Sequence, residues 1–163
     1  MLLKILNLYC LKWITGKLAF CHHSSPNYRG GEGETGSPGS PLAAIAALTK
    51  ISKHCEQFIK YQCVHSFIYN HGTYYAWWVS RQGAKMKYWG GAGVHSGRCA
   101  CRMTKLCARG YDCNCDANDD PMREDSGFLT DKTTLPVTEL RFGDTGSSIE
   151  YGYHILGKLK CWG

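Results

Sequence analysis

The sequence lacks any hydrophobic run long enough to cross a bilayer, which takes about 20 apolar residues in a helix. The hydrophobic first segment, residues 1–21, is interrupted by Lys4, Lys12 and Lys17. Such a segment makes only a marginal core for a secretory signal peptide, and the alternative interpretation is a truncated or misjoined start. We therefore expect no membrane anchor in this chain.

Recognisable catalytic motifs are also missing. The chain has no nucleophile elbow, no His-Glu-x-x-His motif and no phosphate loop, and its seven histidines are scattered. Gly91 and Gly93 lack the third glycine and the strand-helix-strand context of a dinucleotide-binding signature. These absences predict a non-enzymatic protein that needs no cofactor. The chain also has no Asn-x-Ser/Thr sequon, so we do not expect N-glycosylation.

A basic stripe is absent as well, although the formal net charge is +6. The 19 Lys and Arg residues are spread among 13 Asp and Glu residues, so the charge predicts a solvated surface and no nucleic-acid partner. The apolar fraction of 44% is that of a folding sequence, and 163 residues suit one domain with appendages.

Cysteine, in contrast, is abundant. Ten cysteines are present, and a dense, even set of eight occupies the last two thirds of the chain, which is typical of disulfides formed in an oxidising compartment. We therefore expect a secreted or extracellular protein. Cysteines two positions apart are each better placed for a distant partner than for each other, which predicts long-range crosslinks. The predicted disulfide cysteines are Cys55, Cys63, Cys99, Cys101, Cys107, Cys113, Cys115 and Cys161.

A zinc site is the competing use of these cysteines, with His95 as an additional ligand. Structural zinc favours pairs separated by two to four residues, because one intervening residue makes it hard for both sulfurs to reach a tetrahedral centre. The Cys-x-Cys spacings at residues 99–101 and 113–115 therefore favour disulfides over zinc.

Residues 22–41 have the composition of a Gly/Pro/Ser linker. Four glycines recur at every third position, as a collagen triple helix requires, but flexible linkers produce equally short matches by chance. Both interpretations stay open. The four glycines are Gly30, Gly33, Gly36 and Gly39.

Residues 42–163 are predicted to be one folded α+β module in which β elements dominate. Apolar residues at spacings of three and four, from Leu42 to Phe58, predict a helix whose first position is Pro41. This helix would pack on its own domain or, alternatively, mediate oligomerisation. Short aromatic and β-branched runs from Tyr61 onward predict strands, whereas residues 91–129 show little regular structure beyond their bridging cysteines.

Two groups of residues are candidate binding sites. Calcium prefers carboxylate and amide oxygens of the kind found directly after Cys115, but Pro121 replaces the glycine of an EF-hand, so a solvated turn is favoured. Trp77 and Trp78 are adjacent on a predicted strand and face opposite sides, so one should be core and the other surface. Core packing is the default for most of the aromatic rings in this region, with one exposed member as the alternative. The candidate calcium residues are Asp116, Asn118, Asp119 and Asp120, and the candidate aromatic surface comprises Trp77, Trp78 and Trp89.

The order of motifs resembles the fibrinogen-like segment of the contactin-associated proteins, the neurexin IV group of neural and junctional adhesion receptors. The family shows Cys-Glu-Gln-Phe-Ile, then Trp-Trp-Val, Tyr-Trp-Gly-Gly, Cys-Ala-Cys, a single Cys, Cys-Asn-Cys-Asp-Ala, a Leu-Pro-Val run, Gly-Asp-Thr and a closing Cys. The resemblance covers residues 51–163. The matching positions are 55–59, 63, 77–79, 88–91, 99–101, 107, 113–117, 127–137, 143–145 and 161.

The resemblance implies a disulfide-rich fibrinogen-like fold and a recognition or cell-adhesion role toward extracellular or cell-surface proteins. Residues 1–50 do not resemble the first half of a fibrinogen-like domain. A more distant similarity, to the C-terminal propeptides of fibrillar collagens, implies a bridge from Cys63 to Cys113 or Cys115. It also offers a second function, a homotrimeric assembly or anchoring domain of a collagen-like matrix protein.

Overall fold

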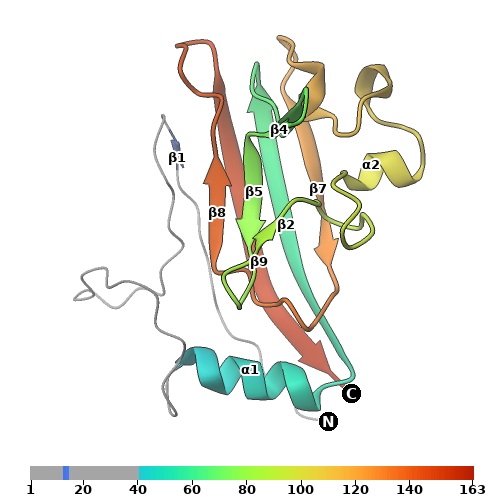
Figure 1. Ribbon diagram of the computed structural model, residues 1–163, viewed down its shortest axis with the longest axis vertical. Coiled ribbons are helices and arrows are strands. Elements are labelled where there is room, and N and C mark those ends of the chain that lie inside the picture. Colours follow the sequence, from blue (N-terminus) through green and yellow to red (C-terminus); the bar gives the residue numbers. More distant parts are fainter. Residues whose placement is uncertain (1–12, 15–40) are drawn as a thin grey trace, which may run out of the picture.

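The computed structural model describes residues 13–14 and 41–163 (Figure 1). Apart from Trp13–Ile14, the hydrophobic first segment lies outside these residues, and so do the collagen-like glycines. The helices and strands are β1 (Trp13–Ile14), α1 (Pro41–Ile51), β2 (His54–Val64), β3 (Tyr69–Asn70), β4 (Thr73–Tyr74), β5 (Ala76–Val79), β6 (Lys85–Met86), α2 (Ala100–Met103), η1 (Ala108–Gly110), η2 (Cys115–Ala117), β7 (Arg123–Leu129), β8 (Glu139–Phe142) and β9 (Tyr151–Trp162).

Two antiparallel sheets form the body of the domain. The larger has the strand order β1-β9-β2-β7 and the smaller has the order β6-β5-β8, while β3 and β4 make a separate hairpin. In Figure 1, α1 lies across one end of the molecule, and β4 and α2 lie toward the other. The described part is therefore β-rich with one main helix, in agreement with the predicted α+β class.

The predicted helix is only partly correct. It begins at Pro41 as expected, but it ends at Ile51, and Ile51 is 79% exposed instead of facing a core. Cys55 and Phe58, which the helical pattern included, lie in β2. Every second residue of β2 from Cys55 to Cys63 is buried, so the strand period of two governs this segment.

Besides the two-residue β1, two longer strands were not predicted from the sequence. Strand β7 lies inside the region expected to have little regular structure, and its residues are mostly polar because it is an edge strand of the large sheet. Strand β9 contains Gly152 and Gly157, and glycines weaken the sequence pattern that predicts a strand. In the structure, Gly152 packs closely on the side chain of Tyr61 and Gly157 on that of Phe58, both in β2.

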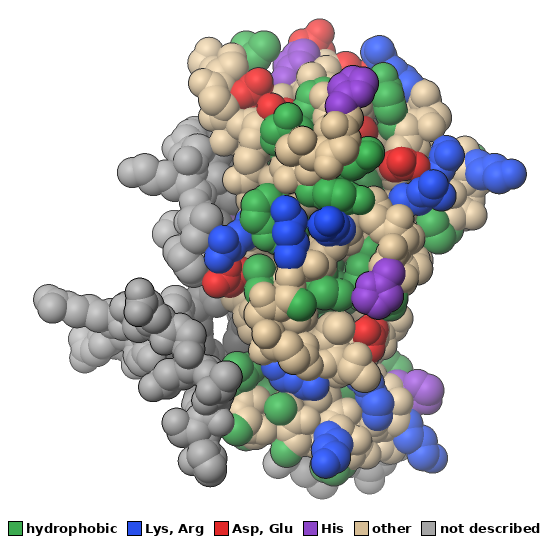
Figure 2. Space-filling view, viewed as in Figure 1, with side chains coloured by type: hydrophobic (Ala, Val, Ile, Leu, Met, Phe, Trp, Pro, Cys, Tyr) green, Lys and Arg blue, Asp and Glu red, His purple; other side chains and the backbone are tan. Residues whose placement is uncertain are grey.

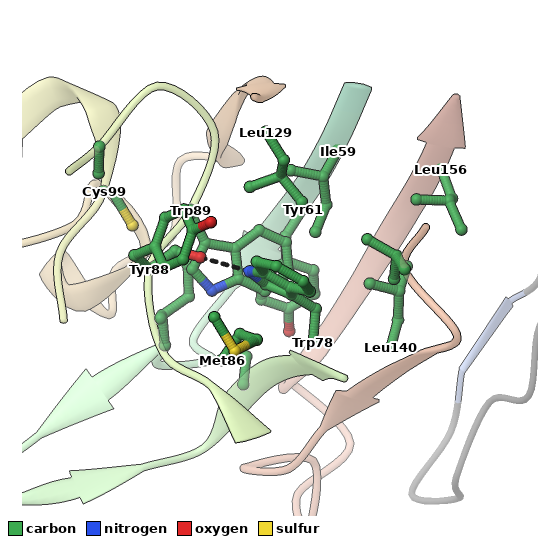
Figure 3. Packing of buried hydrophobic residues seen from close by; sticks show 14 of the residues in the cluster. Ile59, Tyr61, Trp78, Met86, Tyr88, Trp89, Cys99, Leu129, Leu140 and Leu156 are labelled. Atoms are coloured by element: carbon green, nitrogen blue, oxygen red, sulfur yellow. Dashed lines mark hydrogen bonds between the residues drawn. The ribbon is translucent and has the colours of Figure 1, made fainter. Parts of the chain in front are cut away.

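The core lies between the two sheets and joins residues far apart in the sequence (Figure 3). Ile59 and Tyr61 of β2 meet Trp78 of β5, and the Trp78 indole nitrogen donates a hydrogen bond to the carbonyl of Tyr88 at 2.7 Å. Gln57 is also fully buried, and its side-chain amide links β9 to the segment before β8: it accepts from the Val137 amide at 2.9 Å and donates to the Gly157 carbonyl at 3.0 Å.

Within residues 41–163, neither helix is long and apolar enough to traverse a membrane.

Candidate functional site

Four disulfides join the eight predicted cysteines. Two close long stretches of chain, whereas the other two are local, so the expectation of long-range crosslinks throughout was wrong. Cys99 is the N-cap of α2 and Cys101 lies within that helix, and each pairs with a cysteine of the segment that follows. The bridges are Cys55–Cys161, Cys63–Cys115, Cys99–Cys113 and Cys101–Cys107, with sequence separations of 106, 52, 14 and 6.

These bridges bear on the zinc alternative and on the pairing implied by the collagen likeness. Cys99, Cys113 and Asp125 bring three metal-ligand atoms within 4.8 Å of one another, but both sulfurs are already bonded to each other. Cys63 pairs with Cys115, one of the two implied partners.

Asp125 holds the loop that carries Cys113 and Cys115. Its carboxylate accepts hydrogen bonds from the backbone amides of Asn114 at 3.0 Å and Cys115 at 2.9 Å, and it is 3% exposed. Burial raises its pKa to about 6, and the two amide donors oppose that rise. Sequence reasoning missed this residue, because nothing in an isolated Glu-Asp pair signals a buried carboxylate.

The Asp116 carboxylate likewise holds backbone amides, here at the start of β3. One carboxylate oxygen accepts from the backbone amides of Ile68 at 3.1 Å and Tyr69 at 2.8 Å. Burial raises the pKa of Asp116 to about 7, and the nearby Asp125 carboxylate raises it further. The two hydrogen bonds join residues that are 48 and 47 positions apart in the sequence. This predicted calcium ligand therefore fixes the chain at the start of the β3-β4 hairpin.

Of the other predicted calcium ligands, the buried Oδ1 of Asn118 has no hydrogen-bond partner among the described residues, whereas Asp119 and Asp120 contact separate partners. Asp119 receives two hydrogen bonds from Arg123, both at 2.7 Å, and forms an ion pair with Arg109 at 3.0 Å. The carboxylate of Asp120, which is exposed, contacts the imidazole of His65 at 2.9 Å. Asp119 and Asp120 thus face protein cations instead of a common centre, although Oδ2 of Asp116 has no hydrogen-bond partner in the described part of the chain, and calcium binding stays a prediction.

A pocket of about 680 Å³ lies among β3, α2, η1 and η2, at the end of the molecule away from α1 (Figure 1). Its wall combines aromatic rings with polar groups, and the buried Asp116 is one of its lining residues. A wall of this mixed kind suits recognition of an amphipathic group. The side chains used in the argument below are those of Phe67, Tyr69, Asn70, Tyr111 and Asp112.

Sequence reasoning did not find this pocket, because it depends on two disulfides and a buried carboxylate. The Arg102 guanidinium, paired with Asp112 at 3.1 Å, sets one side of it. Tyr111 is 47% exposed and follows η1 at the rim. Phe67, just before β3, and Tyr69, its first residue, also line the pocket, where Asp116 anchors the backbone.

The predicted aromatic surface is wrong for two of its three members. Trp78 and Trp89 are both 0% exposed, and Trp89 packs on Tyr61 with ring centroids 6.1 Å apart. Trp77 faces the other side of β5 and is only half-buried, as expected for adjacent residues on a strand. The Lys85 ammonium lies 3.8 Å from the centre of its ring.

No protein-family model matches the chain. It is 38% identical over 115 residues to human contactin-associated protein 1, an alignment that covers 69% of this chain and 8% of the relative. This stretch is homologous to part of a contactin-associated protein. Neurexin-4 of Drosophila melanogaster is 37% identical over 124 residues, 69% of this chain and 9% of the relative. The chain therefore spans less than a tenth of the length of these curated relatives.

The rat contactin-associated protein 1 gives the same identity and coverage as the human one. The association with contactin that this name states is a property of the relatives.

Proposed function

We propose that residues 42–163 form a non-enzymatic, fibrinogen-like recognition module that acts outside the cell as part of a cell-adhesion system. The observation that carries this proposal is the homology with contactin-associated protein 1 and neurexin-4, which are 38% and 37% identical to the chain. Nothing observed favours the alternative of a homotrimeric assembly domain of a collagen-like protein.

The disulfides support an extracellular location. Six of the eight bridged cysteines are at most 4% exposed, so the bridges are part of the core and not a surface modification. Reduction by cytosolic glutathione would remove crosslinks on which the loops of residues 99–115 depend. The six residues are Cys55, Cys63, Cys99, Cys113, Cys115 and Cys161.

The pocket beside Asp116 is the proposed contact site. Its rim offers Tyr111, Asn70 and Asp112, so an aromatic ring lies beside polar groups, a combination that is common where proteins bind proteins. By analogy with the names of its relatives, the first partner to examine is a contactin-type cell-surface protein.

The test uses the full chain, secreted in oxidised form, on cells that display a contactin and on mock-transfected cells. Binding above the mock level supports the proposal. Tyr111→Ala should weaken binding about tenfold, because truncation of an interface tyrosine often costs more than 1 kcal/mol. Tyr153→Ala is the matched control, since Tyr153 is also exposed but does not line the pocket.

Binding no greater than to mock cells would count against a contactin-type partner. Equal losses in the two tyrosine variants would remove the pocket from the interface.

A further inference from the structure

The outer face of the β6-β5-β8 sheet carries cations next to an aromatic ring. The inner residues of these strands, including Trp78 and Leu140, are buried in the core. Trp77 points the opposite way and lies across from Arg141 of β8 in the strand register. Lys85 of β6 shares this face because it lies across from Val79, two residues after Trp77.

Two lysines on this face lie over aromatic rings. The Lys85 ammonium is 3.8 Å from the centre of the Trp77 ring, and the Lys87 ammonium is 4.8 Å from the centre of the Tyr74 ring. Such contacts hold an ammonium by attraction to the negative face of the ring and leave its outer side open. Both lysines are exposed. On the β3-β4 hairpin, the Tyr74 ring packs against the Tyr69 ring, with ring centres 4.8 Å apart.

The charges of this face are unbalanced. Among the salt bridges between described residues, none includes Lys85 or Lys87, whereas Arg141 is paired with Glu139 at 2.6 Å. The lysine pair is close enough that Lys87, together with burial as the larger cause, lowers the pKa of Lys85. Two like charges are therefore close enough to interact, and neither forms a salt bridge with a carboxylate of the described residues.

Figure 2 shows Lys and Arg side chains gathered beside hydrophobic ones near the middle of this face, over β5 and β8. The face is a shallow surface, and the pocket beside Asp116 is not part of it. A linear polyanion can lie along such a surface, because successive residues on one side of a strand are about 7 Å apart.

We propose that this face, built from Trp77, Lys85 and Lys87, binds a sulfated polysaccharide. Lysine is a compact point charge that suits a sulfate oxygen, whereas planar carboxylates are matched best by the fork of an arginine, and Arg141 is already engaged by Glu139. The half-buried Trp77 and Tyr74 rings hold the two ammonium groups in place and add apolar surface beside the charges. An acidic polypeptide would use the charges without needing the rings.

The test is the affinity of the full oxidised chain for immobilised heparin, the sulfated probe, as salt concentration rises. Lys85→Gln combined with Lys87→Gln should lower the affinity about tenfold at 150 mM salt and flatten the slope of log affinity against log salt by about 1 to 2. Trp77→Leu keeps an apolar side chain but removes the ring, and it should lower the affinity roughly threefold.

The matched control is Lys50→Gln with Lys105→Gln, which removes the same charge from α1 and from the loop after α2, where both lysines are also exposed. Equal losses in the two double variants would overturn the proposal, because binding would then follow net charge alone. Polyglutamate binding as tightly as heparin would also overturn it, in favour of an acidic polypeptide partner. The heparin measurement does not use a contactin. The proposal of a polysaccharide surface and the proposal of a pocket for a contactin-type partner can therefore fail independently.

Discussion

Gly90 and Gly127 pack backbone against backbone. A β-carbon built on Gly127 would lie 2.6 Å from the carbonyl oxygen of Gly90, and one built on Gly90 would overlap the backbone of Gly127. Beside this contact, the amide of Gly91 donates to the carbonyl of Phe128 at 2.9 Å. The Tyr-Trp-Gly-Gly segment thus covers the exposed edge of β7, and it needs glycine in order to approach so closely.

Replacement of Gly90 by alanine should therefore destabilise the domain by about 2–3 kcal/mol, because the two backbones must separate. Urea unfolding of the oxidised protein measures the change. Gly93→Ala is the matched control, since its β-carbon would come no closer than 4.0 Å to Ser96, an ordinary contact. A Gly90 variant as stable as the Gly93 variant would contradict the close approach.

Removal of the Cys55–Cys161 bridge, by serine at both positions, should cost about 4–5 kcal/mol of stability in the chain-entropy model, because the bridge closes a loop of 106 positions. The same treatment of Cys101 and Cys107, only 6 positions apart, should cost about 2 kcal/mol. Thermal and urea unfolding of the two double variants provide the comparison. A larger loss from the short loop would show that strain or local packing, and not loop length, governs these bridges.

Lowering the pH from 7.5 to 5 should stabilise the domain through Asp116. Its folded pKa of about 7 lies above the ordinary value of 3.8, so the folded state binds the proton more tightly than the unfolded state. Stability is then gained as pH falls through 7 and is lost as pH rises, by roughly 2 kcal/mol for this group. Asp125, with a pKa of about 6, acts in the same direction, and the buried His154, whose pKa is lowered by burial, opposes both.

The Asp116→Asn variant keeps an oxygen to accept from Ile68 and Tyr69, so it should fold with a flatter dependence of stability on pH. Asp119→Asn is the control, because arginine neighbours lower the pKa of Asp119 and keep it ionised across this range. Urea unfolding at several pH values measures both. Identical slopes for the wild-type and Asp116→Asn proteins would refute the assignment.

Calcium should produce binding heat at the Asp116–Asp120 cluster only above about 1 mM, the weak end of the range for extracellular modules. Arg123 and Arg109 already satisfy Asp119, and the two carboxylates at the ends of the cluster have other partners. Isothermal titration of the oxidised chain gives the answer. Saturable heat at micromolar calcium that disappears in Asp116→Asn would establish the metal site that the sequence suggested.

The parts of the fold that depend on local chemistry could be predicted from the sequence. Pro41 marks the start of α1, and the two adjacent tryptophans of β5 face opposite sides, because each follows from backbone geometry within a few residues. The length of α1 could not be predicted. Cys55 and Phe58 fit a helical spacing and a strand alternation equally well, and only the pairing of β2 with β7 and β9 decides between them.

The candidate site was less predictable because it is assembled from distant segments. Asp116 was noticed for its oxygen atoms, but its role depends on the amides of Ile68 and Tyr69, which no local pattern indicates. Asp125 gave no signal, since a buried carboxylate is visible only once the chain that surrounds it is folded. The Trp77 surface was anticipated, whereas its lysines come from the next strand, β6.

The bridge between the first long strand and the last has a consequence for survival among extracellular proteases. Cys55 and Cys161 enclose nearly all of the described domain, so a single cut at any loop between them leaves both fragments covalently attached. A nicked molecule can thus retain its binding surfaces while its chain is broken, and cleavage becomes visible only after reduction.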